Sequence, residues 1–450
     1  MSRALDLAEA ALAAAAGEEA EAVVQTELSG FARFAGSEVH QPTLVENHVV
    51  SLRIQRGGRV GGATTNRADA LDDLARRARD AVEMAPEDPD FPGFAPRAAM
   101  PSVDGYDEET AALEPAAQAR LAQQAIAAAR PFELYGYVTS GVVDLAVATS
   151  SGLAAEQRMT DASVLALAAT DGASGYAERQ SSAVGEIEPD AAAEEAARKA
   201  EATRGGEELP TGDYRAVLEP YAFAELLEYF ATDSFNGLGL LEESSYFAGR
   251  LGKRVFASGV SIHEDPLDPA GLPKSIDFEG TPRRRVPIVE NGVARGVVWD
   301  RVTAARAGEQ STGNAVPFEL RRYGPSAVAL SVAGGEAGSP DELAQAVGDG
   351  IWVTRLHYLS VVSPREGIVT GMTRDGTFRI RGGQRAEPLV NLRFTVSVPD
   401  MLADVPALGR EPMLVNRTQW YGDRYAFGYR VPAIATGRFT ITGNGSAPGL

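Results

Sequence analysis

Histidine and cysteine, the side chains that most often bind zinc, are scarce in this sequence: there are four histidines, spread apart, and no cysteine. The histidines, which are common nitrogen ligands of zinc, are His40, His48, His263 and His357. No two of them have the spacing of paired ligands on one helix. His263-Glu264 has the form of half a zinc motif, but Asp265-Pro266 follows directly, and Pro266 would disrupt a helix that carried a second ligand. The histidine pattern therefore does not favour a zinc site.

Other short patterns favour structural roles over chemical ones. Arg56-Gly57-Gly58-Arg59 lacks the glycine order of a phosphate loop and its Lys-Ser/Thr ending, so it is typical of a hairpin turn. No Gly-x-Ser-x-Gly elbow of a serine hydrolase is present. Because adjacent side chains point apart, the pairs Glu242-Glu243 and Glu264-Asp265 indicate solvated surface. The basic clusters Arg283–Arg285 and Arg321-Arg322 likewise indicate solvated strand ends.

Composition argues against several classes of partner. The 450 residues carry a formal net charge of −20 at pH 7 and include no cysteine. Protein surfaces that bind nucleic acids or acidic membranes carry clustered Lys and Arg, so the negative net charge of this chain argues against both partners. Without cysteine there is no thiolate ligand or nucleophile. No apolar stretch reaches the ~20 residues of a membrane span, and Asp6 and Glu9 interrupt the alanine-rich start, which reads as a helix. We expect a cytoplasmic protein that binds neither nucleic acid nor membrane.

The first half of the sequence alternates helical and strand-like segments. Asn66 is placed to cap a helix with an apolar face between residues 71 and 82, and Pro115 and Pro189 can begin two more helices. The strand-like segments are 21–26, 30–35, 47–55, 60–65, 134–139, 142–149 and 154–170. This pattern predicts an N-terminal α/β domain, residues 1–208, with a curved antiparallel sheet and flanking helices.

The second half is rich in strands and turns. Residues 207–212 have the composition of a linker, which places a second domain at residues 209–450. Asn291-Gly292 is a strong hairpin signal, and Asp375-Gly376 and Gly382-Gly383 indicate further turns. Regular short strands predict a mostly antiparallel β domain, either a large sheet or an open barrel. The fold class is therefore predicted to be α+β.

One helical run, Tyr221 to Asp233, lies near the start of this second half. Its apolar side chains recur with the spacing i, i+3, i+4 and i+7 of one helix face, at Phe223, Leu226, Leu227 and Phe230. Glu225, Glu228 and Tyr229 project from the other faces. On its own residues, the run predicts an ordinary amphipathic helix.

Eight short segments have an order and spacing that are more specific than any one of them alone. They are 33–35, 41–43, 61–66, 217–220, 278–280, 289–292, 311–314 and 371–378. Together they resemble the TldD/PmbA family of modulator-of-gyrase peptidases, and the resemblance spans nearly the whole chain. It implies an N-terminal α/β domain and a C-terminal domain built on a mostly antiparallel sheet.

The resemblance also implies a chemistry. The family's peptidase subunit pairs with a PmbA-type subunit, also called TldE, around a cavity in which unfolded or modified peptides are cut. The active subunit carries His-Glu-x-x-x-His on a helix and a cysteine near its C-terminus. Two imidazoles and a thiolate would hold zinc, and the glutamate would activate the water bound to it.

Aligned through Val217–Pro220, that motif falls on the helical run. Glu228 and Asp233 take the two histidine positions, and Tyr229 takes the position of the general base. The cysteine position falls loosely between Arg417 and Gly422, near Thr418. Glu228 and Asp233 could hold a hard cation only if the helix distorts, because five residues place them about 140° apart. We therefore expect no metal or cofactor in this chain, and zinc in a TldD-like partner.

Three functions remain open from the sequence. The first is a PmbA-like, non-catalytic subunit that shapes a peptide chamber beside a TldD-like partner and holds an extended peptide. The second is a diverged enzyme that uses Glu228, Tyr229 or Asp233 in an acid–base role on a small molecule or modified peptide. The third is a homodimeric peptide-binding protein without catalysis.

Overall fold

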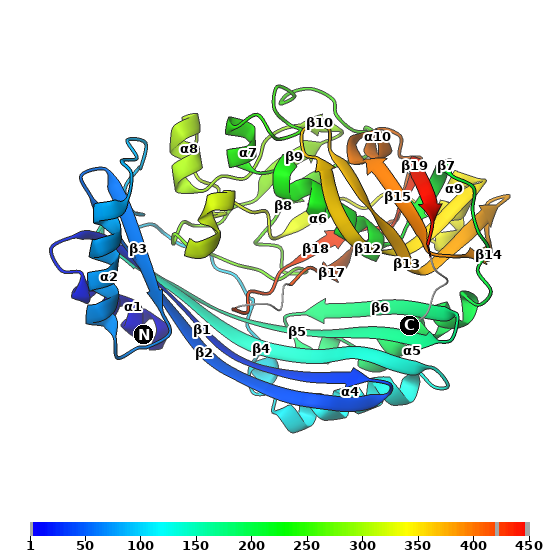
Figure 1. Cartoon of the computed structure of the whole chain (residues 1–450), viewed down its shortest axis with the longest axis horizontal. Coiled ribbons are helices and arrows are strands. Elements are labelled where there is room, and N and C mark those ends of the chain that lie inside the picture. Colours follow the sequence, from blue (N-terminus) through cyan, green and yellow to red (C-terminus); the bar gives the residue numbers. More distant parts are fainter. Residues whose placement is uncertain (1–2, 419–422, 446–450) are drawn as a thin grey trace.

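A strongly curved, six-stranded antiparallel sheet forms one layer of the molecule, and two further sheets lie against its concave side (Figure 1). The computed structural model describes residues 3–418 and 423–445. The strand order of the curved sheet is β3-β2-β1-β4-β5-β6. Its strands are β1 (Glu19–Ala35), β2 (Glu38–Arg56), β3 (Arg59–Thr65), β4 (Glu133–Thr149), β5 (Ala154–Thr170) and β6 (Ala173–Ser181).

Two pairs of predicted strands are in fact single long strands. Residues 21–26 and 30–35 both belong to β1, and residues 134–139 and 142–149 both belong to β4. The glycines that suggested interruptions are sites of close packing: a Cβ on Gly30 would lie 2.1 Å from Oε1 of Gln118, and one on Gly141 would lie 2.8 Å from Nε of Arg424. The predicted hairpin at Arg56–Arg59 is confirmed as the β2–β3 turn.

Helices cover the side of the curved sheet that faces away from the rest of the chain, as α1 and α4 show in Figure 1. The proline starts at Pro115 and Pro189 are confirmed, but Asn66 does not cap the next helix. That helix begins at Leu71 after an uncapped Ala70, because the chain between Asn66 and the helix forms a turn that the bond from the Ala70 N–H to the Arg67 carbonyl closes at 3.2 Å. The helices of this half are α1 (Arg3–Ala14), α2 (Leu71–Met84), α3 (Glu108–Ala111), α4 (Pro115–Ala128) and α5 (Pro189–Ala202).

The second sheet closes on itself. The pairings β12–β7, β7–β19, β19–β15, β15–β13 and β13–β12 complete a ring, so this part is a closed barrel and not an open one. β12 and β7 run parallel, whereas the other four pairs are antiparallel. The strands are β7 (Gly212–Leu218), β12 (Gly350–Ser363), β13 (Ile368–Arg381), β14 (Gln384–Leu389), β15 (Leu392–Ser397), β16 (Ala407–Leu408) and β19 (Ile434–Asn444).

The turn predicted at Asp375-Gly376 is wrong, since both residues lie inside β13. They have positive φ angles of 55° and 136°, and the pairing with β12 shifts register just there. A Cβ on Gly376 would lie 2.5 Å from Oγ1 of Thr354. The pair therefore forms a bulge that lets two barrel strands approach closely. The turn at Gly382-Gly383, between β13 and β14, is confirmed.

A third sheet has the order β10-β9-β8-β11-β18-β17. The hairpin at Asn291-Gly292 is confirmed, with φ angles of 49° and 77° that suit a tight turn. The strands are β8 (Ile262–Glu264), β9 (Val286–Glu290), β10 (Val293–Ala294), β11 (Leu330–Val332), β17 (Met413–Asn416) and β18 (Gly428–Val431). The remaining helices are α6 (Pro220–Ser234), α7 (Gly237–Leu241), α8 (Arg301–Ala307), α9 (Pro340–Val347) and α10 (Val398–Ala403).

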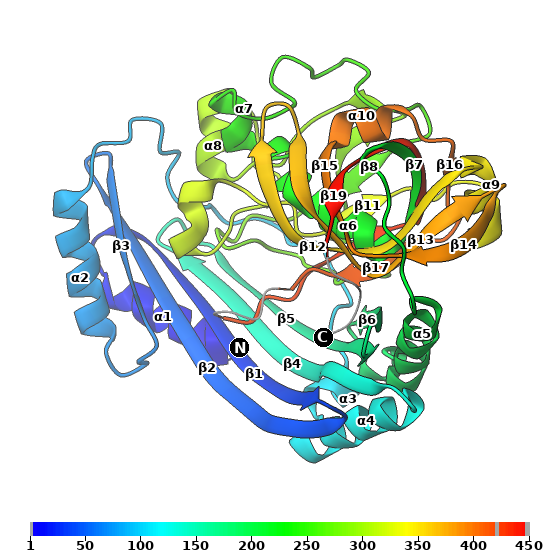
Figure 2. The ribbon, with the colours of Figure 1, turned by 45° about the vertical axis from the view of Figure 1, so that its right-hand side comes forward.

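The α+β class is confirmed. All strands of the curved sheet lie within residues 19–181, and all strands of the other two sheets lie within residues 212–444. The division into domains 1–208 and 209–450 stays a prediction. Figure 2, turned by 45°, shows the barrel and the third sheet side by side above the curved sheet. None of the described helices is long and apolar enough to cross a membrane.

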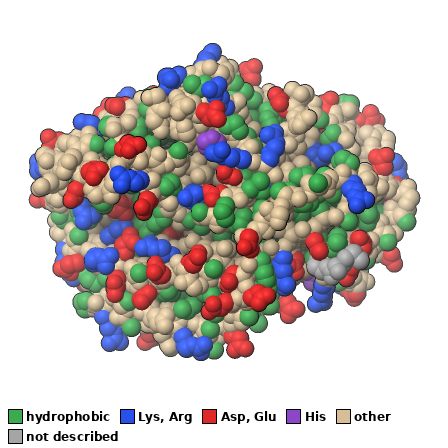
Figure 3. All heavy atoms as spheres, turned by 180° about the vertical axis from the view of Figure 1, so that it is seen from behind, with side chains coloured by type: hydrophobic (Ala, Val, Ile, Leu, Met, Phe, Trp, Pro, Cys, Tyr) green, Lys and Arg blue, Asp and Glu red, His purple; other side chains and the backbone are tan. Residues whose placement is uncertain are grey.

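Among the charged residues that were predicted to be solvated, some are exposed and others are buried. On the face seen in Figure 3, acidic and basic side chains are interspersed. Arg284, Arg285 and Arg322 are exposed, as predicted.

Arg283, Arg321 and Glu264 were wrongly predicted to be solvated. Arg283 is 3% exposed and Glu264 is fully buried, and Arg321 forms ion pairs with Glu21 and Glu279. The partners are not neighbours in the sequence: Arg283 lies near Glu264, 19 residues before it, and Glu21 precedes Arg321 by 300 residues. Spacing along the sequence cannot reveal such pairs.

Candidate active-site region around helix α6

Helix α6 is held between the barrel and the third sheet by its apolar face. Pro220 occupies the first turn, where its missing N–H costs nothing. The predicted core positions are confirmed, because Phe223, Leu226, Leu227 and Phe230 are all buried. The Phe230 ring also packs against three further aromatic rings at centroid distances of 5.5 to 6.1 Å, those of Phe235, Tyr246 and Phe256. This packing fixes the direction in which the polar side chains of α6 point.

Glu228 makes a direct ion pair with Arg417, the residue that follows β17. Nε of Arg417 donates to Oε2 of Glu228 at 2.7 Å. Burial alone would disfavour the charged guanidinium, but the carboxylates of Glu228, Glu225 and Glu178 outweigh it and raise the pKa of Arg417. Arg417 is therefore a permanent positive charge beside α6.

Two more carboxylates face Arg417. Burial raises the pKa of Glu225 to about 7, although Arg417 and Arg355 oppose the rise. Burial also raises the pKa of Glu178, on β6 of the curved sheet. The Tyr176 hydroxyl donates to Oε2 of Glu178 at 2.6 Å, and the N–H of Asn416 donates to Oε1 at 2.8 Å.

Arg355 of β12 is the second cation. It pairs with Asp375 at 3.2 Å and lies over the Tyr176 ring at 4.2 Å from its centroid. We call Glu178, Glu225, Glu228, Arg355 and Arg417 the Arg417 cluster. Its members come from the curved sheet, from α6, from the barrel and from the end of β17. The cluster therefore ties all three sheets together around one face of α6.

The structure brings only some of the predicted site residues together. Burial, followed by Glu228 and Glu225, raises the pKa of Tyr229, which places its hydroxyl beside the cluster. Burial is the single cause that raises the pKa of Asp233, so no charged group acts on it. Glu228 thus belongs to the cluster and Tyr229 adjoins it, whereas Asp233 does neither.

Thr418, at the loosely aligned cysteine position, follows Arg417 directly. Its Oγ1 accepts a hydrogen bond from Nε2 of Gln180 at 3.0 Å. Residues 419–422, the rest of that aligned segment, lie outside the described residues. The aligned positions of the family's zinc site therefore do come near one another, at Glu228 and Thr418, but with different side chains.

These side chains do not fit zinc. Glu228 is already neutralised by Arg417, and the pKa of Tyr229 is raised, which opposes the phenolate form that a metal would need. Within residues 3–418 and 423–445 no group of three or more His, Cys, Asp or Glu side chains is placed to hold a metal ion. His357 lies in β12, where burial and then Arg355 lower its pKa to about 4. The donor set is that of a buried ion-pair network.

Glu225 gives a pH-dependent prediction. Its folded-state pKa is raised from 4.5 to about 7, so the folded chain holds this proton more tightly than the unfolded chain. The contribution of protonated Glu225 to the free energy of unfolding is fully present below pH 4.5 and is lost as pH rises through about 7. Glutamine does not ionise, so Glu225→Gln should keep its free energy of unfolding over this range. Its advantage over the parent chain, measured by urea denaturation, should therefore grow by up to about 3 kcal/mol. A difference between the two chains that does not change with pH would contradict this assignment.

Comparison with known proteins defines the class of this chain as metallopeptidase-related. Residues 20–85 match domain 1 of the PmbA/TldA metallopeptidase family model, and residues 211–443 match its C-terminal domain. The chain belongs to the PmbA/TldD family.

Two curated relatives come from methanogens. A metalloprotease of Methanothermobacter thermautotrophicus is 27% identical over 45% of this chain and 44% of its own length. An uncharacterized protein of Methanocaldococcus jannaschii is 35% identical over 22% of this chain and 24% of its own length. The chain thus spans less than half the length of each of these relatives.

Solved structures share the fold over almost the whole chain. TldE of Thermococcus kodakarensis aligns with a TM-score of 0.85 at 18% identity, covering 97% of this chain and 99% of that one. A proposed modulator of a DNA gyrase from Thermotoga maritima aligns with a TM-score of 0.84, the same identity and the same coverage. At this identity the alignments show a common fold.

Proposed function

We propose that this chain is the non-catalytic, PmbA/TldE-type subunit of a TldD-type metallopeptidase pair that processes unfolded or modified peptides. The observation that carries the proposal is the 2.7 Å ion pair between Arg417 and Glu228. Glu228 is the residue aligned with the first zinc-binding histidine of the family. A guanidinium can donate hydrogen bonds but has no coordination position, so it cannot coordinate a water molecule and lower its pKa as a metal does.

The Arg417 cluster supports a structural role for α6. Removing one of the two arginines would leave carboxylates largely buried without their partner, which costs several kcal/mol. The network therefore holds the curved sheet, the barrel and the third sheet in one arrangement. In the proposed pair, the rigid wall that results would shape one side of a peptide chamber, while zinc and the activated water would belong to the partner.

The comparisons support this assignment at the level of the family. One solved structure with this fold is named TldE and one curated relative is named a metalloprotease, and these names support a TldD/TldE-type role. The proposed partner is a TldD-like subunit carrying His-Glu-x-x-x-His, and the proposed site of action is the cytoplasm.

Co-purification tests the proposal. Expressed together with a family member that carries His-Glu-x-x-x-His, this chain should form a one-to-one complex by native mass spectrometry, and the complex should cleave an unfolded polypeptide such as reduced casein. The isolated chain should cleave nothing. A stable homodimer that joins no such partner would contradict the proposal and favour a peptide-binding protein without catalysis.

One observation favours the alternative of a diverged enzyme. A carboxyl with a pKa of about 7, such as that of Glu225, is suited to general acid–base work at neutral pH. Arg417 and Arg355 act on the same carboxyl, however, which gives the cluster a structural explanation.

A further inference from the structure

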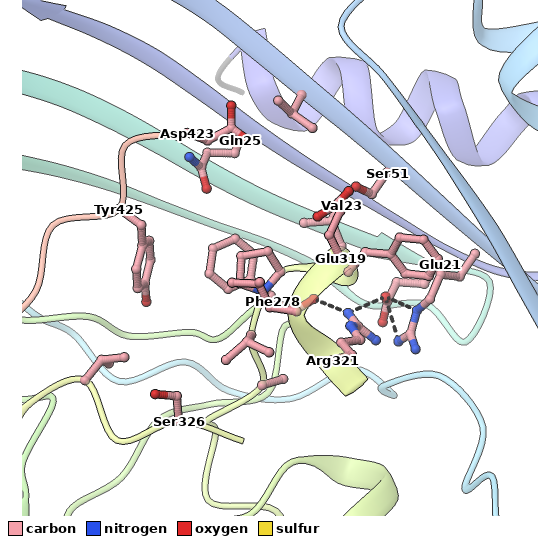
Figure 4. A pocket seen from close by; sticks show the side chains of 18 of the residues that line it. Glu21, Val23, Gln25, Ser51, Phe278, Glu319, Arg321, Ser326, Asp423 and Tyr425 are labelled. Atoms are coloured by element: carbon pink, nitrogen blue, oxygen red, sulfur yellow. Dashed lines mark hydrogen bonds and ion pairs between the residues drawn. The ribbon is translucent and has the colours of Figure 1, made fainter. Parts of the chain in front are cut away.

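A pocket of about 400 Å³ lies between the concave face of the curved sheet and the chain segment 315–328 (Figure 4). Its floor is a strip of two paired strands. Glu21, Val23 and Gln25 of β1 face it, and their direct partners on β2 are Arg53, Ser51 and Val49. The next pair on the same face is Glu27 with Asn47. The strip from Glu21 to Glu27 is about 20 Å long.

The middle of the pocket is apolar. Val23 and Val49 form its floor, and Phe278, Phe318 and Tyr425 lie over it. The Phe278 and Tyr425 rings pack against each other with centroids 5.0 Å apart. An enclosed apolar surface of this size is typical of a site for an apolar ligand group.

At the inner end of the pocket the charges balance, but two buried polar atoms lack a hydrogen bond to any described residue. Arg53 and Arg321 both pair with Glu21 and with Glu279, at 2.8 to 3.4 Å. Glu21 is 1% exposed and lines the pocket, yet its Oε2 has no hydrogen-bond partner among the described residues, and neither has Nε of Arg321. Buried polar atoms are normally bonded. This end therefore holds one buried acceptor and one buried donor that the described residues leave without a hydrogen bond.

The outer end carries uncompensated negative charge. Glu27 lies at this end of the strip, and Glu319 and Asp423 line the pocket. No Lys or Arg among the described residues forms an ion pair with any of these three carboxylates. Nδ2 of Asn47, the partner of Glu27 on β2, donates to Oδ1 of Asp423 at 3.1 Å, and the N–H of Arg424 donates to Oε2 of Glu27 at 3.0 Å, which places Glu27 beside Asp423. Burial, and then Glu27 and Glu319, raise the pKa of Asp423. The nearby guanidinium of Arg424 is engaged by Asp161 at 2.7 Å.

We propose that this pocket binds a primary ammonium joined to an apolar group, with the ammonium between Glu27, Glu319 and Asp423 and the apolar group between Val23, Val49 and Phe278. The amino-terminal end of a short peptide has these features. The inference rests in part on the proposed function, since both involve peptides, but it concerns binding by this chain alone.

Calorimetric titration of the isolated chain tests the inference. The dipeptide amide Phe-Leu-NH₂ should bind, and acetylating its amino group should weaken binding about ten-fold or more, which corresponds to about 1.4 kcal/mol. The double variant Glu319→Gln/Asp423→Asn should weaken binding of the free dipeptide amide to a similar extent. Phenethylamine separates two sources of the ligand: weaker binding than the dipeptide amide indicates a peptide end, and equal binding indicates a simple amine.

Glu242→Gln, which also removes an exposed carboxylate, is the matched control and should leave binding unchanged. Both rim carboxylates are exposed, so the double variant should fold, as its circular dichroism spectrum can show. Absence of binding by the folded parent chain would overturn the inference, and so would equal binding of the acetylated dipeptide or unchanged binding by the double variant. None of these outcomes depends on the activity of a complex, so they are distinct from failure of the proposed function.

Discussion

Replacing Arg417 by methionine should lower the free energy of unfolding by about 3 kcal/mol at pH 8, the lower end of the cost of breaking a buried ion pair from one side, because 19% and 16% of the two side chains remain exposed. Methionine keeps much of the apolar volume of the arginine but leaves Glu228 without its partner at 2.7 Å. It also removes a charge that lowers the pKa of Glu225 and of Glu178. Urea denaturation followed by circular dichroism measures the effect.

Two controls identify the cause of this loss. Arg438→Met removes an exposed arginine that pairs with Asp213 at 3.1 Å, and should change stability by less than about 1 kcal/mol. Adding Glu225→Gln and Glu228→Gln to Arg417→Met should recover much of the loss, because it removes the unpaired charges. If Arg417→Met is no more damaging than Arg438→Met, the cluster does not hold the sheets together.

In the complex with a TldD-like partner, Glu228→Gln/Asp233→Asn in this chain should leave peptidase activity without measurable change. Glutamine and asparagine keep the shapes of the two side chains and remove their charges, so any metal-binding or acid–base role would be lost. The corresponding Glu→Gln change in the partner's His-Glu-x-x-x-His should reduce turnover by about 10²–10⁴-fold, as for loss of a general base.

The contrast between the two chains separates the proposed subunit from a diverged enzyme. If the variant of this chain lost activity as severely as the variant of the partner, Glu228 or Asp233 would be catalytic. Tyr229→Phe completes the comparison, since it removes the hydroxyl beside the cluster and keeps the ring. Complex formation should be confirmed for each variant, so that loss of assembly is not read as loss of chemistry.

Local patterns of the sequence predicted most of the helices that surround the site. Helix α6 was predicted from apolar side chains at i, i+3, i+4 and i+7, and the starts of α4 and α5 were predicted from a single proline each. All of these signals involve residues only a few positions apart. The Asn291-Gly292 hairpin is equally local, because the two residues supply the positive φ angles that the turn needs. These elements could therefore be placed without knowing what they pack against.

The site itself depends on contacts that are remote in sequence. Arg417 lies 189 residues from Glu228, and the Glu178 carboxylate, bonded to Asn416, lies 238 residues before it. Glu178 stands on β6, a strand that the sequence did not predict. Two signals were visible in the sequence: Glu225 on a polar face of a mostly apolar helix, and Arg417 at the start of the segment aligned with the zinc-binding cysteine. Neither indicated the other, since only the fold brings them together.

Zinc analysis of the purified, isolated chain, paired with a cleavage assay on reduced casein, tests most directly whether this chain lacks a catalytic metal centre. We expect the isolated chain to hold far less than one zinc ion and to cleave nothing. The complex with a His-Glu-x-x-x-His partner should contain zinc and cleave casein. One tightly held zinc ion in the isolated chain, lost on chelation together with cleavage by that chain alone, would contradict it.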